Sequence, residues 1–435
     1  MSPQFFLCFF SFFGILSPVL AQTAILAPIH KDPDALLYTV SVYLKTPLQP
    51  TKLHLDLGAS FTWVDCSKDY NSTTYQHIPC GSSLCNSFHT FSCANCYEPP
   101  GPACSNNSCS IYPENPVTRQ ATLATALIDS LALPTTNGSG PGQMGLIPEF
   151  VFSCSRTFLL NGLAKEVVGL AALGRSNHSL PAQISNAFSS PRCFALCLSG
   201  SISAPGVAFF GTSGPYIFSP GVDLSKSLVY TELILNPVGS TVISYNQQPS
   251  DEYYINLTSI KVNGKPIEIN ISQLSIDENG YGGTKLSTDT SYSTLESSIY
   301  KAFVEAFVNE SAGLNLTGTS RIKPFDVCYQ ASDIVNTLVG PGVPTVDLVM
   351  GNEDVFWRIF GSNSMVRIER DGVDAWCLGF LDGGVNARTS IVIGGHQMED
   401  NLLQFDLEAK KLGFSSSVLL KRTTCASFNL GSKFI

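Results

Sequence analysis

Charge is scarce in this chain of 435 residues: Lys, Arg, Asp and Glu together make up 14% of it, and the formal net charge is −9. Without a basic excess, the chain has no electrostatic reason to bind nucleic acid or an anionic membrane surface. Long apolar runs are missing after residue 21, so no later segment is expected to span a bilayer. Charge runs, low-complexity linkers and short tandem repeats are also absent. The length allows two domains or one large β domain.

The first 21 residues, MSPQFFLCFFSFFGILSPVLA, form an apolar run that ends in the small residues Val19 and Ala21. This pattern predicts a signal peptide over residues 1–21, cleaved before Gln22, although the usual basic start is missing. A membrane anchor is the alternative, and the shortness of the run and its Gly14 and Pro18 disfavour it.

Two further features indicate export. Eight N-x-Ser/Thr sequons predict glycosylation, at Asn71, Asn106, Asn137, Asn177, Asn256, Asn270, Asn309 and Asn315. Of the 14 cysteines, 13 lie after the leader, and seven of those fall between Cys66 and Cys109. Such density is typical of a disulfide-stapled protein from an oxidising compartment, so the chain is expected to be secreted.

The cysteines are not expected to bind metal. The pattern C-x-x-C occurs once, at Cys93 and Cys96, and no Cys/His pair lies nearby at the spacing of a zinc site. No metal or other cofactor is therefore expected. An odd number of cysteines leaves one thiol unpaired, and Cys193 is the candidate.

The apolar periodicity is mostly that of strands. "YTVSVYL" places Val40, Val42 and Leu44 on one face, and "KLHLDLG" does the same for Leu53, Leu55 and Leu57. Helical spacing is clear in one segment, residues 299–307, and a shorter candidate is "LPAQISNAF". A weak half-chain repeat, "LHLDLGASFTWV" and later "GGTKLSTDTSYSTL", predicts two similar β lobes, residues 22–228 and 229–435.

The motif "HLDLGASFTWVDC" resembles the first active-site segment of the pepsin-like aspartic proteases. The plant branch of that fold is recognisable in "VVGLAALGRSNHSLPAQI", "FALCLSG", "FDVCYQ", "CLGFLDGG" and "SIVIGGHQMEDNLLQFDLEAKKLGFS", which occur in the order that branch uses. The chain is most similar to its subfamily of xyloglucan-specific endoglucanase inhibitors, extracellular dermal glycoproteins and basic 7S-like globulins. The resemblance implies an all-β, bilobal fold with few short helices.

An aspartic protease needs two carboxylates that share one proton. Aligned with the family pattern, the first is Asp56, but Ser287 stands where the second should be. Asp289 falls two residues further on, about 7 Å along an extended strand and beyond a shared proton. Leu57 also replaces the Thr or Ser that would brace the two loops. The resemblance therefore implies a degenerate site in which Asp56 and Ser287 are vestigial and no residue is catalytic.

The flap agrees with this interpretation. Active plant relatives carry Tyr-Gly-Asp-Gly-Ser on the hairpin that covers the substrate, whereas Tyr112 is followed here by Pro113. A hairpin that must open and close thereby gains a rigid residue and loses its glycines. The chain is expected to be no enzyme.

The resemblance implies a secreted, monomeric, non-proteolytic inhibitor of cell-wall-degrading glycoside hydrolases, above all xyloglucan-specific endo-β-1,4-glucanases, in the apoplast or cell wall. Retaining glycosidases keep two carboxylates in the sugar groove, and a guanidinium can bridge them. In this family arginines on two C-lobe loops play that part, which points to Arg388 in "GGVNARTSIVIGG" and Arg321 in "LTGTSRIKPFDVC". A peptide- or hormone-binding globulin, or a storage protein, is the alternative. His396 is expected to be structural.

The resemblance also implies six disulfides, with Cys193 left free. The expected pairs are Cys66–Cys154, Cys80–Cys85, Cys93–Cys109, Cys96–Cys104, Cys197–Cys425 and Cys328–Cys377.

Overall fold

The computed structural model describes residues 24–89, 91–243 and 248–431, so the predicted signal peptide lies outside the described residues. Strands dominate, and the two longest helices are α2 (Leu180–Phe188) and α3 (Ser297–Ala312). Both fall where the sequence predicts helix, and the all-β prediction is confirmed. Shorter helices are α1 (Ser83–Asn86), α4 (Gly361–Ser364) and α5 (Gly395–Met398). No helix among these residues is long and apolar enough to cross a membrane.

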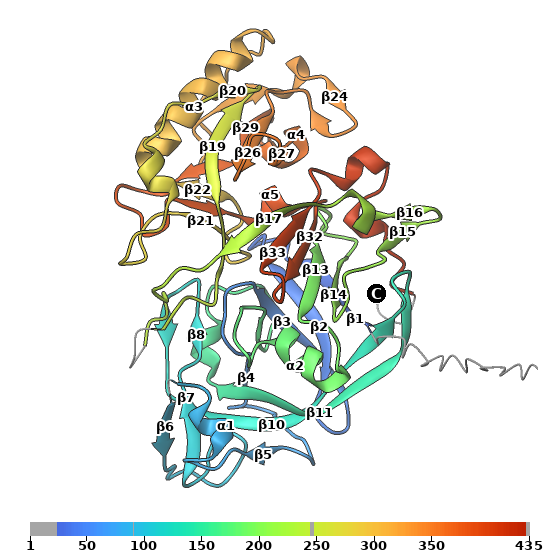
Figure 1. The fold of residues 1–435 in the computed structure, drawn as a ribbon, viewed down its shortest axis with the longest axis vertical. Helices are drawn as coiled ribbons and strands as arrows, with labels where there is room; N and C mark the ends of the chain where they lie inside the picture. The colour runs from blue at the N-terminus through green and yellow to red at the C-terminus, as the bar shows by residue number, and fades with distance from the viewer. Residues whose placement is uncertain (1–23, 90, 244–247, 432–435) are drawn as a thin grey trace, which may run out of the picture.

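The first half of the chain forms the lower lobe in Figure 1. Its strands are β1 (Ala24–Lys31), β2 (Tyr38–Leu44), β3 (Gln49–Asp56), β4 (Trp63–Asp65), β5 (Gln76–His77), β6 (Phe91–Ala94), β7 (Ser108–Ile111), β8 (Glu114–Asn115), β9 (Gln120–Ala121), β10 (Ala124–Thr136), β11 (Pro141–Ser155), β12 (Gly169–Ala172), β13 (Cys193–Cys197), β14 (Gly206–Phe210), β15 (Ile217–Ser219) and β16 (Val222–Asp223). The alternating apolar residues of β2 and β3 are all fully buried, as their period of two requires. Strand β3 pairs in parallel with β12, and β4 pairs in parallel with β11.

The second half repeats this pairing pattern in the upper lobe. Its strands include β17 (Val229–Ile234), β18 (Tyr253–Ile255), β19 (Leu257–Val262), β21 (Thr284–Leu286), β22 (Ser293–Leu295), β26 (Val346–Met350), β27 (Phe356–Ile359), β28 (Met365–Arg370), β29 (Val373–Leu378), β30 (Phe380–Asp382), β31 (Ile391–Ile393), β32 (Leu402–Asp406) and β33 (Lys411–Phe414). Strand β21 pairs in parallel with β31, and β22 pairs in parallel with β30. The two candidate site segments, which end β3 and follow β21, therefore occupy equivalent places in the two lobes.

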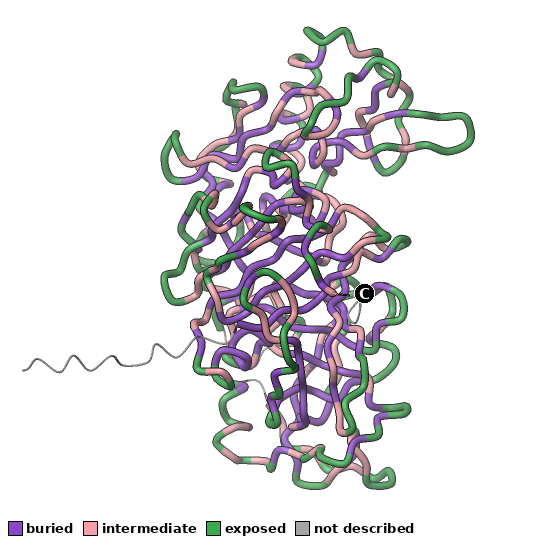
Figure 2. Tube along the Cα trace, turned by 90° about the vertical axis from the view of Figure 1, so that its right-hand side faces the viewer, coloured by how far each residue is buried: buried purple, intermediate pink, exposed green. Residues whose placement is uncertain are grey.

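Strands from both halves meet between the lobes, where green and red ribbons run side by side in Figure 1. Strand β13 pairs with β32, and β17 pairs with β33. One hydrophobic core extends through both lobes, and the exposed loops lie around it (Figure 2). Because the halves share these strand pairs, the lobe boundary after residue 228 stays a prediction.

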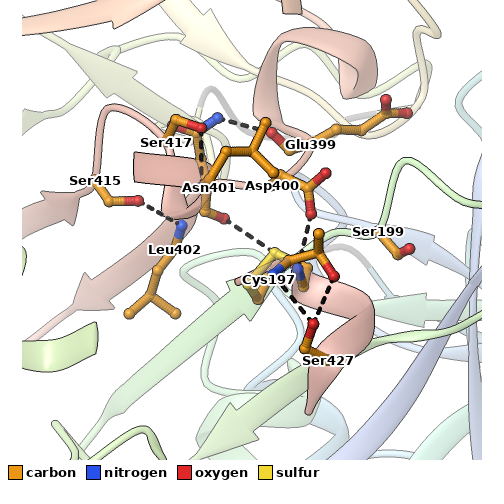
Figure 3. The surroundings of a disulfide bond; sticks show 12 residues. Cys197, Ser199, Glu399, Asp400, Asn401, Leu402, Ser415, Ser417 and Ser427 are labelled. Atoms are coloured by element: carbon orange, nitrogen blue, oxygen red, sulfur yellow. Dashed lines mark hydrogen bonds between the residues drawn. A yellow bond between two sulfur atoms is a disulfide. The ribbon is translucent and has the colours of Figure 1, made fainter. Parts of the chain in front are cut away.

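Six disulfides join cysteines within the described ranges, and four of them are the expected pairs Cys66–Cys154, Cys96–Cys104, Cys197–Cys425 and Cys328–Cys377. Cys193 is free and buried. Figure 3 shows the Cys197–Cys425 bond, which joins β13 to the C-terminal segment, with Asp400 and Ser427 beside it.

The remaining two pairs correct the expectation. The structure joins Cys80 to Cys93 and Cys85 to Cys109, not Cys80 to Cys85 or Cys93 to Cys109. Cys85 on α1 and Cys109 on β7 are both fully buried in one small apolar cluster. Because the packing of α1 against β7 brings these two together, Cys80 and Cys93 are left to join each other nearer the surface. The spacing of the cysteines along the sequence cannot reveal this pairing, since the six cysteines from residue 80 to residue 109 could pair in 15 ways.

All eight sequon asparagines are exposed, as attachment of a glycan requires. Their glycosylation stays a prediction.

Candidate functional site

A cleft of about 670 Å³ lies between the lobes, and Asp56 and Asp289 both line it. Asp56 is the last residue of β3 and is only 3% exposed. Its Oδ1 accepts hydrogen bonds from the backbone N–H groups of Gly58 (2.7 Å) and Ala59 (3.0 Å). The turn after β3 therefore fixes this carboxyl group at the cleft floor.

Asp289 reaches the same floor, which strand spacing did not predict. Strand β21 ends at Leu286, and the chain bends at residues 288–289, so the extended distance of about 7 Å does not apply there. Ser287 donates from Oγ to Oδ2 of Asp289 (3.2 Å). Burial raises the pKa of Asp56 well above its ordinary value, and the negative charge of Asp289 raises it further. The two carboxyl groups thus act on each other electrostatically.

His54 is a site residue that the sequence analysis missed. It is fully buried, and its Nε2 lies 3.2 Å from Oδ1 of Asp289. Its Nδ1 has no hydrogen-bond partner among the described residues. The signal was present in the sequence, because His54 and Asp56 are two residues apart on one strand and share a face.

The brace between the two loops is one-sided. Thr288 accepts from the N–H of Leu57 (3.0 Å) and donates to the carbonyl of Leu55 (2.7 Å). Leu57 has no hydroxyl to return these bonds, and its side chain is buried in the core instead. In a symmetric brace each of the two loops would supply one hydroxyl, whereas here only the loop of Thr288 supplies one.

The hairpin β8–β9 lies over the cleft as the flap. Trp63 donates from Nε1 to the carbonyl of Glu114 (2.9 Å), which ties the hairpin to its own lobe. The carboxylate of Glu114 accepts from the N–H of Val242 (2.7 Å), across the cleft. Arg119 pairs with Glu114 (2.6 Å) and donates to the carbonyl of Ser240. We call these contacts to Ser240 and Val242 the cross-lobe clamp.

The cleft also holds a buried ion pair of the second lobe. Lys285 on β21 pairs with Glu252, and both side chains are mostly buried. Burial alone would raise the pKa of Glu252, but the charge of Lys285 and its hydrogen bond outweigh it and lower that pKa. Lys285 therefore serves as the ion-pair partner of Glu252.

The two arginines expected at an inhibitory surface differ in exposure. Arg321 is open to solvent, with 76% of its side chain exposed and a single ion pair to Asp326 at 3.5 Å. Arg388 is only partly exposed, contrary to expectation: its guanidinium donates to the carbonyls of Val238 (3.0 Å) and Gly239 (3.3 Å). It also lies over the ring of Tyr281. The loop after β17 folds back onto Arg388, a tertiary contact that its flanking motif could not reveal.

His396 lies away from the cleft. Its ring nitrogens contact Glu399 (3.2 Å) and the carbonyl of Met365 (3.0 Å). This arrangement agrees with the structural role expected for it.

Comparisons with known proteins cover nearly the whole chain. Residues 38–212 match the family model described as xylanase inhibitor N-terminal, and residues 252–416 match the one described as xylanase inhibitor C-terminal. The "Probable aspartic proteinase GIP1" of Glycine max is 55% identical over 97% of this chain and 95% of its own length. "Gamma conglutin 1" of Prunus dulcis is 39% identical over 93% of this chain and 89% of its own length.

Solved structures with the same overall fold are found as well. The crystal structure of edgp superposes with a TM-score of 0.92 at 46% identity, covering 96% of this chain and all of that one. An aspartic proteinase from Irpex lacteus superposes with a TM-score of 0.56 at 13% identity, over 92% of this chain and 99% of its own, which shows the pepsin-like fold alone.

Proposed function

Because the chain belongs to the plant family of pepsin-fold proteins that match the xylanase inhibitor models, we propose that it is a secreted, non-proteolytic inhibitor of cell-wall-degrading glycoside hydrolases. One observation carries the proposal: both halves of the chain, and so both lobes, match inhibitor models. The apoplast is the proposed location and a monomer the proposed state.

The geometry of the cleft supports the absence of proteolysis. Ser287 stands where the second catalytic carboxylate would be, and Asp289, though close, already has His54 and Ser287 as partners. The flap that a protease opens for its substrate is held by the cross-lobe clamp through Glu114 and Arg119. The name of the Glycine max relative includes proteinase, so this point needs its own assay.

Xyloglucan-specific endo-β-1,4-glucanases are the proposed targets. Their catalytic carboxylates would be bridged by a guanidinium, which presents its N–H donors in a planar fork. Arg321 is free to enter such a groove, because it gives up only one long ion pair at the surface. Arg388 would first have to leave the carbonyls of Val238 and Gly239. We therefore assign the leading role to Arg321 and a supporting role to Arg388.

A globulin that binds a peptide or serves as storage is the second candidate. The similarity to gamma conglutin 1 favours this candidate, since the name of that relative does not describe an inhibitor. Such a protein needs the scaffold and the cleft but no exposed arginine.

Inhibition of a purified secreted xyloglucanase separates the two candidates. Wild-type protein should inhibit it, and Arg321→Ala should weaken inhibition by at least about 30-fold, because truncating an interface hot spot costs about 2 kcal/mol or more. Arg388→Ala should weaken it less. Arg156→Ala, which removes an exposed arginine of the other lobe, is the control and should leave inhibition unchanged.

Two results would count against the proposal in different ways. Equal inhibition by wild type and both arginine variants would refute the insertion of arginine while leaving inhibition itself intact. No inhibition of any xyloglucanase or xylanase would favour the globulin.

A further inference from the structure

The space between the lobes is large, and the flap spans part of its opening. Its volume of about 670 Å³ falls in the range of small-molecule pockets. The cross-lobe clamp passes over it, joining Glu114 and Arg119 of the flap to Val242 and Ser240 of the other lobe. A ligand that needs the flap to lift would have to break these bonds, whereas a small molecule that fits beneath the flap would not. The closed flap therefore favours a small ligand.

One wall of this chamber is aromatic. Phe61, Trp63, Phe88 and Tyr112 all line it. Phe61 and Phe88 meet edge to face at 5.9 Å between ring centroids, and His178 stacks on Phe88 at 4.1 Å. Such a wall suits a flat or apolar group, and aromatic faces also attract cations.

The negative charge of the floor is only partly balanced, because Lys285 acts electrostatically on Asp289 while forming its ion pair with Glu252. Three other carboxylates line the chamber, and each has a cation near it: Glu114 pairs with Arg119, Glu252 pairs with Lys285, and Asp251 interacts with Arg175. The guanidinium of Arg175 donates to the backbone carbonyls of Glu252 and Ile234. Across the described ranges, neither Asp56 nor Asp289 forms an ion pair with a lysine or arginine. The nearest basic side chain to Asp289 is the imidazole of His54, with Nε2 at 3.2 Å.

The charge of Asp289 also disfavours the ionisation of Asp56. After burial, the charge of Asp289 is the next largest cause of the raised pKa of Asp56. A cation placed between them would be attracted by both and would favour the ionised form of Asp56. Binding would then release a proton.

From the flap, the wall and the floor together we propose that this chamber binds a small organic cation that carries an aromatic or apolar ring. The ammonium group lies between Asp56 and Asp289, and the ring lies against Phe61 and Phe88. The proposal does not depend on glycosidase inhibition, because it uses neither Arg321 nor Arg388.

Calorimetric titration of the full glycosylated chain at neutral pH tests it, with phenethylamine as the probe and 2-phenylethanol as its neutral match. Phenethylamine should bind with a Kd of about 1 mM or tighter, at least about tenfold more tightly than the alcohol. Titration in two buffers of different ionisation enthalpy should show release of protons. Equal binding of amine and alcohol, or no saturable binding of the amine, would overturn the proposal.

A charge variant locates the site. Asp289→Asn keeps an acceptor for His54 but removes the charge, and should weaken phenethylamine binding at least about tenfold without affecting 2-phenylethanol. The matched control, Asp371→Asn, removes an exposed carboxylate between β28 and β29 and should change neither. Unchanged amine binding by a folded Asp289→Asn protein would place the ligand elsewhere and refute the assignment. Should that variant not fold, the comparison of amine with alcohol on the wild type still decides. An extended basic heptapeptide that bound as tightly as the amine would refute the inference that the clamped flap favours a small ligand.

Discussion

A buried ion pair between the lobes offers the sharpest test of what stabilises this fold. Lys31 on β1 pairs with Glu399 beside α5 at 2.5 Å, and their side chains are only 11% and 8% exposed. Tyr38 donates to the same carboxylate (2.6 Å), and His396 contacts its other oxygen (3.2 Å). Burial alone would raise the pKa of Glu399, but His396 and Lys31 outweigh it and lower that pKa to about 2.

Glu399→Gln should therefore be strongly destabilising. A fall in pKa from 4.5 to about 2 corresponds to about 3 kcal/mol of preference for the ionised group in the folded state. The variant also removes the ion-pair partner of the buried Lys31 ammonium, and breaking a buried pair in this way costs about 3–5 kcal/mol. We expect a loss of about 3 kcal/mol in the free energy of unfolding. Lys31→Met should cost less, because Glu399 keeps Tyr38 and His396 as partners.

Denaturant unfolding of the oxidised protein provides the measurement. The double variant should cost less than the sum of the two single ones, since it leaves neither charge alone. Lys165→Met, which removes an exposed pair with Asp34, is the control and should have little effect. The contribution of Glu399 is complete above about pH 4.5 and lost as the pH falls toward about 2, so wild type and Glu399→Gln should converge in acid. Strictly additive single effects, or a loss no larger than the control's, would show that the pair does not stabilise the junction.

Three further predictions concern other parts of the chain. Ser287→Asp should not restore pepstatin-sensitive cleavage of a denatured protein, because Leu57 still lacks the bracing hydroxyl and the flap stays clamped; turnover by this variant would contradict both reasons. Burial raises the pKa of Asp400 to about 6, so the folded state holds that proton more tightly and stability falls as the pH rises from about 4 to about 6. The rise from 3.8 to about 6 corresponds to about 3 kcal/mol, so Asp400→Asn should gain up to about 3 kcal/mol at neutral pH. The variant keeps its bond from the N–H of Cys425 (2.7 Å), and a loss of stability measured by denaturant unfolding would refute this. Replacing Cys197 and Cys425 by Ser should cost about 5 kcal/mol, because the bond closes a loop with a sequence separation of 228; an unchanged unfolding midpoint would argue against the loop-entropy estimate.

The sequence by itself determined the elements and their kind. The period-two pattern of β2 and β3 survives intact in the structure, since residues that alternate along a strand must face the same side. The helical spacing in α3 and the Pro-containing segment of α2 survive for the same local reason. The half-chain repeat places Asp56 and Ser287 at equivalent positions of two lobes.

The tertiary structure decided which residues meet. Asp289 reaches the cleft floor because β21 ends two residues before Thr288, and Arg388 is held because a loop 150 residues away in sequence supplies two carbonyls. The pairing of Cys85 with Cys109 depends on the packing of one short helix against a strand. These contacts depend on the path of the chain in space, whereas sequence patterns report only which face each residue takes within its own element. For that reason the fold could be predicted from the residues, while the partners of Asp289, Arg388 and Cys85 could not.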